Sequence, residues 1–409
     1  MSSIAANTAF LTIINIVRIL SPFIALPYVL RTVGAERFGE IAFAQSFAAF
    51  AVILVNFGLD VSAVKDVSLN RDDKRSLGRI VSSVLGVKAL LFLAVGIIYA
   101  IGIAALPTLR GNAPLFLITY MIAFPEIVFP QWYFQGVERM KLLTITSFLS
   151  IAFYLATLFL VVRSADDYLY VPALQIGGLI LSSLVGLYIL LFVEKIRLVM
   201  PTTQELWQTF SNSIPFFASR ASIVINQNLA KIATGIFLGM TEVAAFELAQ
   251  KIITAAFIPF KMFNQAIYPH SARRQDVKLA KRMFLLTALG AAIASCAIYM
   301  LAPWGVKIFA GSQAIIPQSI NILRCLIGYY FFGCLGMYLG LPTLMAWGYA
   351  KPFNASVYLS TLTLLAVYAL LYATDAYGLT AFALALAAVE IVISAYRYRY
   401  YRKIVQPSA

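Results

Sequence analysis

The sequence has few charged residues, few cysteines and almost no histidine. Charged residues make up 12% of its 409 residues, and hydrophobic residues make up 61%. That is too little charge to cover the surface of a soluble protein of this length. The single histidine, His270, excludes a metal site built on several histidines. Cys296, Cys325 and Cys334 lie within apolar stretches without metal-ligand spacing, so we expect neither a bound metal nor a disulfide framework.

Signatures of nucleotide hydrolysis and of soluble enzymes are also lacking. The sequence contains no Gly-Lys dipeptide and therefore no P-loop, the phosphate-binding loop of many ATPases. No long polar segment between the apolar stretches could form an enzyme domain. We therefore expect a protein that is not an enzyme and has no cofactor, and transport is favoured over catalysis.

Long apolar runs follow one another along the whole chain. Each is long enough to cross a hydrocarbon core of roughly 30 Å, which takes about 20 helical residues. Such segments must be helices, because lone strands cannot satisfy their backbone groups in lipid. The predicted fold class is an all-α integral membrane protein with about twelve transmembrane helices. The expected spans are 9–30, 39–60, 80–106, 114–134, 142–162, 168–193, 210–238, 242–270, 281–303, 317–345, 353–374 and 376–396.

The basic residues of the loops indicate the orientation in the membrane. One alternating set of loops is rich in lysine and arginine, with clusters at 65–79, 273–282 and 397–403, and the other set has few. Cytoplasmic loops carry the excess of basic residues. We therefore expect a multi-pass protein with both termini in the cytoplasm. Because the basic residues are spread over separate loops, nucleic-acid binding is not expected.

The two halves of the chain resemble each other weakly. The segment 33–45 can be laid over 238–250, and both join the first and second helix of a six-helix half. We predict an N-terminal six-helix bundle at 1–200 and a C-terminal one at 201–409, related by a pseudo-two-fold axis along the membrane normal. Transporters built in this way place their substrate between the repeats.

Basic residues nevertheless occur inside the expected spans. They are Arg18, Lys88, Arg220, Lys231, Lys251, Lys261 and Arg324. Only Glu126, Glu247 and Glu390 lie comparably deep. A charge at bilayer depth is costly and marks a wet cavity, a partner or a substrate path. Because the cations are in excess, we expect an anionic ligand, and phosphate suits both arginine and lysine.

Polar residues gather on one face of the first and second helix of each predicted half. In the span 210–238, Arg220, Gln227 and Lys231 fall within an arc of roughly 40° at 100° per residue. Such faces could line one central cavity. The residues that we predict to line it are Arg18, Arg220, Lys231, Lys261, Asn15, Asn56, Gln227, Gln250 and Asn264.

Several of the buried polar residues have structural explanations. Lys88 can snorkel to the headgroups, and Lys251 can pair with Glu247 one helical turn away. Arg324 can hold a helix contact. Tyr28, Tyr120, Trp132 and Tyr329 could stack on sugars, although aromatic residues also belong at membrane interfaces. Glu126 and Glu390 could pair with cavity cations or load H⁺ or Na⁺, and Glu126 is the first candidate for ion coupling.

Two stretches carry a resemblance to a known family. One is Leu26-Pro-Tyr-Val-Leu-Arg-Thr-Val-Gly-Ala-Glu-Arg-Phe-Gly-Glu-Ile-Ala-Phe-Ala-Gln45, continued by Asn56-Phe-Gly-Leu-Asp60. The other is Pro130-Gln-Trp-Tyr-Phe-Gln-Gly-Val-Glu-Arg-Met-Lys141. They resemble the O-antigen and polysaccharide-unit flippases (Wzx-type) of the multidrug/oligosaccharidyl-lipid/polysaccharide exporter superfamily. The resemblance implies a V-shaped pair of six-helix bundles in the bacterial inner membrane.

The resemblance also implies a function in surface-polysaccharide synthesis. An undecaprenyl-pyrophosphate-linked oligosaccharide would cross from the cytoplasmic to the periplasmic leaflet by alternating access. Membrane lipids, a polysaccharide polymerase and a chain-length regulator would be its partners. Two alternatives stay open: a cation-coupled antiporter of drugs or small solutes with the same fold, and an assembly partner of a polymerase that transports nothing itself.

Overall fold

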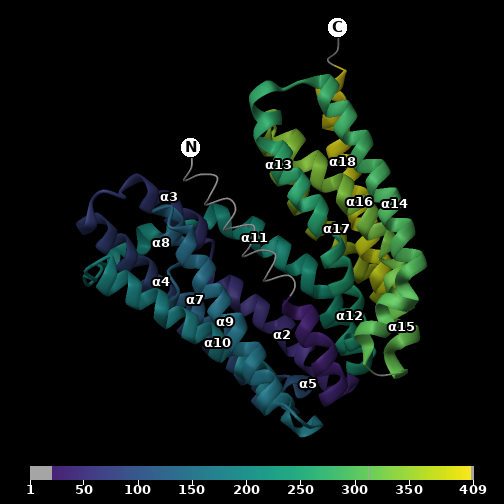
Figure 1. The fold of residues 1–409 in the computed structure, drawn as a ribbon, viewed down its shortest axis with the longest axis horizontal. Coiled ribbons are helices and arrows are strands. Elements are labelled where there is room, and N and C mark those ends of the chain that lie inside the picture. Colours follow the sequence, from purple (N-terminus) through teal and green to yellow (C-terminus); the bar gives the residue numbers. More distant parts are fainter. Residues whose placement is uncertain (1–20, 312, 407–409) are drawn as a thin grey trace. The chain divides into compact units, whose positions relative to one another are not determined.

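A computed structural model of the protein describes residues 21–311 and 313–406, and these form helices joined by short turns (Figure 1). Ten segments of the described residues are long and apolar enough to cross a membrane. The predicted all-α integral membrane fold is thereby confirmed. The ten segments are Ala35–Leu69, Lys74–Ala105, Ala113–Gly136, Met140–Val161, Ala165–Val193, Met240–Arg274, Val277–Ala310, Gln313–Met345, Ala350–Ala373 and Leu379–Val405.

These segments correspond to ten of the twelve expected spans. Of the other two, the span 9–30 begins outside the described residues, and 21–33 is helical. The span 210–238 falls on α11 (Thr203–Phe237), a continuous helix of 35 residues that is not among the ten apolar segments. Its polar side chains lower the hydropathy of this helix. The number of twelve membrane helices therefore stays a prediction.

The chain divides into two compact units, Met1–Val224 and Ile225–Ala409. The division falls inside α11, whereas the sequence-based boundary between 200 and 201 lies just before this helix. Because α11 is continuous across Val224 and Ile225, no break in the helix marks the division between the units. The division at 200/201 and the symmetry of two six-helix bundles stay predictions.

The first unit is an assembly of long helices and short helical pieces. Helices α9 and α10 pack along each other (Figure 1). They approach closely at Gly178, where a Cβ atom would lie 2.5 Å from the carbonyl oxygen of Ser150. Small residues allow such close helix contacts in membranes. The elements before α11 are α2 (Ala35–Asn56), α3 (Leu59–Leu69), α4 (Lys74–Ala105), α5 (Pro107–Arg110), α6 (Ala113–Tyr120), η1 (Met121–Ala123), α7 (Phe124–Val128), α8 (Gln131–Gly136), α9 (Met140–Val161), η2 (Ala165–Leu169), α10 (Tyr170–Tyr188) and η3 (Ile189–Val193).

The junction between α2 and α3 is fixed by aromatic stacking. Phe57 has a left-handed backbone with φ 45°, a conformation that costs free energy for any residue other than glycine. Its ring stacks on Phe210 and Phe217 of α11, with centroid distances of 4.5 and 4.2 Å. These contacts hold the turn that places Asn56 and Asp60 on either side of it.

The turn before α4 shows how the sequence starts a helix. Asp73 is the N-cap, and its carboxylate accepts a hydrogen bond from the main-chain N–H of Arg75 at 2.9 Å. The Ser76 hydroxyl also donates to this carboxylate, and these bonds hold the pKa of Asp73 below its ordinary value. The cap satisfies donors that the first helical turn leaves unpaired.

The second unit contains the remaining helices. Helix α18 packs against both α16 and α17. Arg397 of α18 donates to the carbonyl oxygen of Gly336 at 2.7 Å and to the Ser356 hydroxyl at 2.8 Å, which ties three elements together. The elements after α11 are α12 (Met240–Ala256), α13 (Ile258–Arg274), α14 (Val277–Ala310), η4 (Gln313–Ile315), α15 (Ile316–Cys325), α16 (Ile327–Tyr338), η5 (Leu339–Met345), α17 (Ala350–Ala373) and α18 (Leu379–Val405).

One local feature recurs at matching places in the weak internal repeat. Gly34 precedes α2 with φ 84°, and Gly239 precedes α12 with φ 131°. Residues with a side chain are strained at these φ values, so glycine is required at both turns. The two glycines align in the predicted repeat, although this match concerns one turn and not whole bundles.

Candidate functional site

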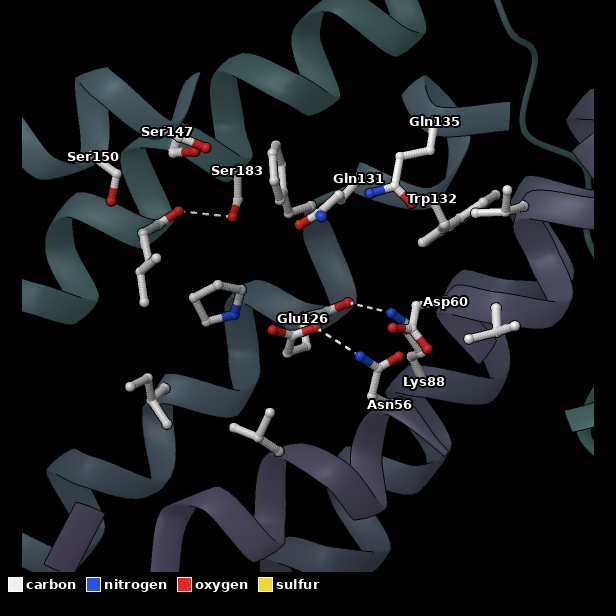
Figure 2. Close-up of a pocket in the computed structure, with 18 of the residues that line it drawn as sticks. Asn56, Asp60, Lys88, Glu126, Gln131, Trp132, Gln135, Ser147, Ser150 and Ser183 are labelled. Atoms are coloured by element: carbon white, nitrogen blue, oxygen red, sulfur yellow. Dashed lines mark hydrogen bonds between the residues drawn. The ribbon is translucent and has the colours of Figure 1, made fainter. Parts of the chain in front are cut away.

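A cavity of about 780 Å³ lies inside the first unit (Figure 2). Helices α2, α3, α4, α7, α8, α9, α10 and α11 all contribute to its walls. The polar and charged residues among its lining are Ser21, Asn56, Asp60, Lys88, Glu126, Gln131, Trp132, Gln135, Ser147, Ser150, Ser182, Ser183 and Arg220. Asn56 and Arg220, two of the residues predicted to line a cavity, therefore meet at one cavity with Glu126, the first candidate for ion coupling.

The charged core of the cavity forms where the short helix α7 ends. Pro130 lies two residues after the end of the helix. It has no N–H group, and it favours an extended backbone at the preceding residue, Phe129. The main-chain carbonyl of Glu126 lies in the last turn, whose carbonyls lack helical donors. The ammonium group of Lys88 donates to this carbonyl at 3.0 Å. Lys88 thus caps the C-terminal end of α7, where a cation is also favoured by the helix dipole.

Lys88 does not snorkel to the headgroups, as the sequence analysis suggested it could. The side chain is only 1% exposed, and it points into the interior of the unit toward Glu126, with Asp60 nearby (Figure 2). A lysine that snorkels would place its ammonium group at the membrane surface. The buried acceptor at Glu126 and the surrounding carboxylates offer the cation a partner instead.

The carboxylate of Glu126 is itself held in place. The side-chain amide of Asn56 donates to it at 3.1 Å (Figure 2). The side-chain amide oxygen of Asn56, Oδ1, is buried and has no hydrogen-bond partner among the described residues. Asn56 is the last residue of α2, so the strained turn at Phe57 controls where this amide points.

An ion pair also lines the same cavity. Arg220 of α11 and Asp60 of α3 approach to 3.7 Å, with side chains that are 49% and 36% exposed. Such an open pair is weakly held, because water screens it and the side chains keep their freedom. Arg220 is therefore available for another partner at little cost.

The four charges of the cavity compensate one another. Lys88 and Arg220 are balanced by Asp60 and Glu126. Asp60 was not counted among the deep acids, and it supplies the second acid of this cavity. The described residues that line the first-unit cavity include many polar groups and carry no net formal charge.

The second unit contains a cluster of two cations and one acid. Lys231 of α11 lies 2.9 Å from the carboxylate of Glu247 in α12, and Lys251 lies 3.2 Å from the same carboxylate. The expected intrahelical pair of Lys251 and Glu247 is confirmed. Lys231 also has an acidic partner, which the sequence could not reveal because the partner is on another helix. The cluster keeps one positive charge in excess.

The other predicted cavity residues of the second unit lie on α11, α12 and α13. Gln250 donates to the main-chain carbonyl of Gln227 at 3.0 Å. Asn264 is 4% exposed, and neither polar atom of its amide has a partner among the described residues. Lys261 has an exposed side chain. Whether these residues line a substrate path stays a prediction.

The remaining candidates have different settings. The guanidinium of Arg324 lies over the ring of Tyr299 at 4.7 Å, a helix contact of the kind expected for it. Glu390 of α18 lies close to Gly333 and Gly336 of α16. Arg18 and Asn15 fall outside the described residues. No group of three or more histidine, cysteine or acidic residues in the described chain could hold a metal ion.

Sequence reasoning missed Asp60, Gln131 and Gln135, and it gave Lys88 a structural role. Gln131 and Gln135 lie on one face of the short helix α8, and both line the cavity (Figure 2). A signal for Lys88 was present: Pro130 lies four residues after Glu126, so the carbonyl of Glu126 lacks its helical donor. A buried lysine without an acid on its own helix is a natural candidate to replace that donor.

The membrane-spanning helices and the buried polar cavity define a membrane protein of a transporter fold. The chain belongs to the family described as "Polysaccharide biosynthesis protein", which it matches over residues 4–275, more than half of its length. It is 23% identical over 358 residues to the "Putative O-antigen transporter" of Escherichia coli K12, covering 86% of each chain. The protein of the same name from Shigella dysenteriae is 23% identical over 77% of this chain and 83% of that one.

Solved structures support the fold. The lipid II flippase MurJ in an inward closed conformation matches with a TM-score of 0.73 and 15% identity, over 97% of this chain and 90% of that one. A multidrug resistance MATE family transporter of the MOP superfamily, in an inward-facing conformation, matches with a TM-score of 0.67 and 14% identity, over 95% and 99% of the two chains. At these identities the likeness concerns the fold. These relatives are named as transporters and a flippase, in agreement with a chain that is not an enzyme.

Proposed function

We propose that the protein is a flippase for an undecaprenyl-pyrophosphate-linked oligosaccharide, such as an O-antigen repeat unit. It moves this lipid from the cytoplasmic to the periplasmic leaflet of the bacterial inner membrane by alternating access. The observation that carries the proposal is a charged, hydroxyl-lined cavity inside a unit of membrane-spanning helices, in a member of a polysaccharide biosynthesis family. Buried polar groups of this kind are costly in a membrane and mark a substrate path.

The cations of the second unit suit the pyrophosphate. Lys231 and Lys251 share the single carboxylate of Glu247, so their cluster carries an excess positive charge. Phosphate oxygens accept charge-assisted hydrogen bonds from ammonium and guanidinium groups. The lipid tail stays in the bilayer while the headgroup moves. A polysaccharide polymerase and a chain-length regulator are the partners that would take over the flipped unit.

An ion gradient is proposed to drive the cycle. Glu126 is the first candidate to load H⁺ or Na⁺, because its carboxylate lies at the polar cavity beside Asn56. Glu390 in α18 is the second candidate. No cofactor takes part in this proposal.

One other function is favoured by a specific observation. The fold likeness to a MATE transporter, together with the carboxylates of Asp60 and Glu126, would suit an antiporter of cationic solutes. Against it, Lys88 and Arg220 compensate both acids. An antiporter predicts that deletion changes drug sensitivity and leaves surface polysaccharide intact.

A deletion strain tests these functions. We expect lipid-linked repeat units to accumulate in the cytoplasmic leaflet and surface polysaccharide to disappear. Complementation with Arg220→Gln or Lys231→Gln should fail although the proteins are present, whereas Lys307→Gln, which changes an exposed cation of α14, should complement. Units that accumulate in the periplasmic leaflet would identify an assembly partner of the polymerase and would refute the flippase.

A further inference from the structure

One end of the second unit carries exposed basic residues without acidic neighbours. The segments 273–282 and 399–403, together with Lys351, contain nine lysines and arginines, all of them exposed, and a single acid. That acid, Asp276, caps α14 by accepting hydrogen bonds from two main-chain N–H groups of the first turn. Within the part of the chain that the structure describes, none of the nine basic residues forms an ion pair. The positive charge of these residues is therefore not compensated.

The basic loops of the first unit are different. The segments 65–79, 138–141 and 194–197 contain the same number of lysines and arginines, but with five acids among them. Arg139, for example, forms an ion pair with Glu194. Orientation in the membrane depends on lysine and arginine and hardly on acids. The topology signal therefore explains the basic residues of both units, but it does not explain why acids are nearly absent from those of the second.

Side-chain contacts gather the basic segments of the second unit at the same end of it. The amide of Gln275 donates to the main-chain carbonyl of Ala346 at 3.1 Å, which ties the turn between α13 and α14 to the turn before α17. The ring of Phe284 in α14 lies against Tyr398 and Tyr401 of α18, with centroid distances of 5.8 and 5.0 Å. The C-terminal end of α18 therefore lies beside the start of α14 (Figure 1). The nine basic residues together form what we call the basic end of the unit.

Two cations of the basic end belong to the contact between α14 and α18. Lys281 precedes Phe284 by three residues, and Arg402 follows Tyr398 by four residues. Residues at these spacings share a helix face. Each cation is therefore on the face of its helix that carries the aromatic contact.

Exposed apolar side chains continue from these cations along the same two helices. On α14, Leu285 and Leu289 follow Lys281 by one and two helical turns, and both are exposed. On α18, the exposed Ile391 and Tyr398 precede Arg402. A soluble anion would contact only the cations, and an acidic protein would leave the apolar surface uncovered. A phospholipid matches both, because it joins a phosphate to apolar chains.

We propose that the basic end of the second unit is a binding surface for anionic phospholipids. Lys281 and Arg402 hold the phosphate, which accepts charge-assisted hydrogen bonds from both, and the acyl chains lie along the exposed apolar side chains of α14. Tyr398 lies at headgroup level, where tyrosine is favoured. Clusters of basic residues at the ends of membrane helices attract anionic lipids. The inference depends neither on the proposed flippase function nor on which side of the membrane this end faces.

Lipid binding to the purified full-length protein tests the proposal. Native mass spectrometry measures the affinity for phosphatidylglycerol, which is anionic, and for phosphatidylcholine, which has no net charge. The wild type should prefer phosphatidylglycerol by roughly fivefold or more, and the preference should shrink as salt is added. The double variant Lys281→Gln with Arg402→Gln should bind phosphatidylglycerol roughly five- to twenty-five-fold more weakly, because one basic residue near an anionic lipid contributes a factor of about five. Its binding of phosphatidylcholine should not change.

The matched control removes the same charge from the other unit. Lys65→Gln with Arg75→Gln replaces one exposed lysine and one exposed arginine of the first unit, and it should leave phosphatidylglycerol binding unchanged. Lys281→Arg with Arg402→Lys keeps both charges and should bind like the wild type, which separates a lost charge from a misfolded protein. Equal weakening in the control would show a response to net charge alone and would overturn the proposal. Unchanged binding in the Lys281→Gln, Arg402→Gln protein would overturn it too.

Competition identifies the chemistry of the ligand. Glycerol phosphate and polyglutamate, at the same concentration as phosphatidylglycerol, should not displace it, because neither carries acyl chains. Displacement by glycerol phosphate would reveal a site for a soluble anion, and displacement by polyglutamate a docking surface for an acidic protein. Tighter binding of farnesyl pyrophosphate than of phosphatidylglycerol would assign the surface to a pyrophosphate lipid. Each of these three results would refute a phospholipid surface.

Discussion

Lys88 of α4 donates a hydrogen bond to the main-chain carbonyl of Glu126, at the point where α7 ends before Pro130. A side chain thus completes the backbone hydrogen bonding of a broken membrane helix. Within a membrane an unsatisfied carbonyl is costly, and broken helices are tolerated where neighbours satisfy the freed groups. The same contact places a cation in the wall of the polar cavity. Lys88 therefore both stabilises the broken helix and contributes to the cavity.

Replacing Lys88 should destabilise the first unit. Lys88→Met leaves the Glu126 carbonyl without its donor, and we expect a loss of about 1–3 kcal/mol in the free energy of unfolding. Lys88→Arg keeps a charged donor and should lose less. Thermal unfolding in nanodiscs, followed by intrinsic fluorescence, measures both. Equal stability of wild type and Lys88→Met would show that the bond contributes nothing.

A double-mutant cycle tests why the donor is needed. Pro130→Ala supplies a main-chain N–H and relaxes the constraint on Phe129, so the chain can begin to satisfy its own carbonyls. In the Lys88→Met background this change should cost less than in the wild type, with a coupling of about 0.5–3 kcal/mol. If the losses of stability in the two single variants simply add in the double variant, the hydrogen bond of Lys88 does not depend on Pro130.

The cluster around Glu247 predicts an order of effects. Lys231 is 12% exposed and Lys251 is 39% exposed, so removal of Lys231 takes the more buried partner from the carboxylate. Lys231→Gln should therefore destabilise the second unit more than Lys251→Gln, and Glu247→Gln, which leaves two cations without their acid, should be the most damaging. Melting temperatures of the three variants give the order. A larger loss for Lys251→Gln would contradict it.

Much of the fold could be predicted from the sequence because membrane helices are read from the length of apolar runs. The pair of Lys251 and Glu247 was also within reach, because residues four apart share a helix face. The contact of Lys231 with Glu247 joins α11 to α12, and no spacing along the chain reports a distance between helices. Asp60 is the last residue of the expected span 39–60, so the sequence does not show that it lies as deep as Glu126. The left-handed turn at Phe57 returns it to the cavity.

Helix α11 shows that a clear periodic pattern in the sequence does not reveal which residues its side chains contact. Its polar stripe of Arg220, Gln227 and Lys231 could be read from the sequence, but the partners of these side chains could not. Arg220 reaches the first-unit cavity, whereas Lys231 pairs with Glu247 in the second unit. A helix that takes part in two compact units gives one periodic signal for two environments.

Glu126 should couple flipping to an ion gradient. Glu126→Gln keeps an oxygen that accepts from Asn56 but cannot ionise, so the fold is retained while the charge is lost. In proteoliposomes, wild-type flipping should respond to an imposed pH or Na⁺ gradient, and Glu126→Gln should not. Glu390→Gln is the companion variant, and loss of the response there alone would move the coupling site to α18.

The orientation can be read with reporter fusions. We expect green fluorescent protein after Ala409 to fluoresce and alkaline phosphatase at that position to be inactive, because the loops on that side are the basic ones. Phosphatase inserted after Gly111 should be active, since this turn belongs to the opposite set of loops. The reverse pattern would invert the proposed topology and the direction of transport.

The pair of Arg220 and Asp60 should matter for transport and hardly at all for folding. At 3.7 Å, with both side chains more than a third exposed, it should contribute no more than about 1 kcal/mol to stability. Arg220→Gln and Asp60→Asn should therefore melt close to the wild type yet lose flipping. Exchange of the two residues, Asp60→Arg with Arg220→Asp, restores the attraction but moves the cation from α11 to α3. If the pair acts only as a clamp, the exchanged protein flips normally. If Arg220 meets the substrate, the exchanged protein is stable and inactive, and that is the outcome we expect.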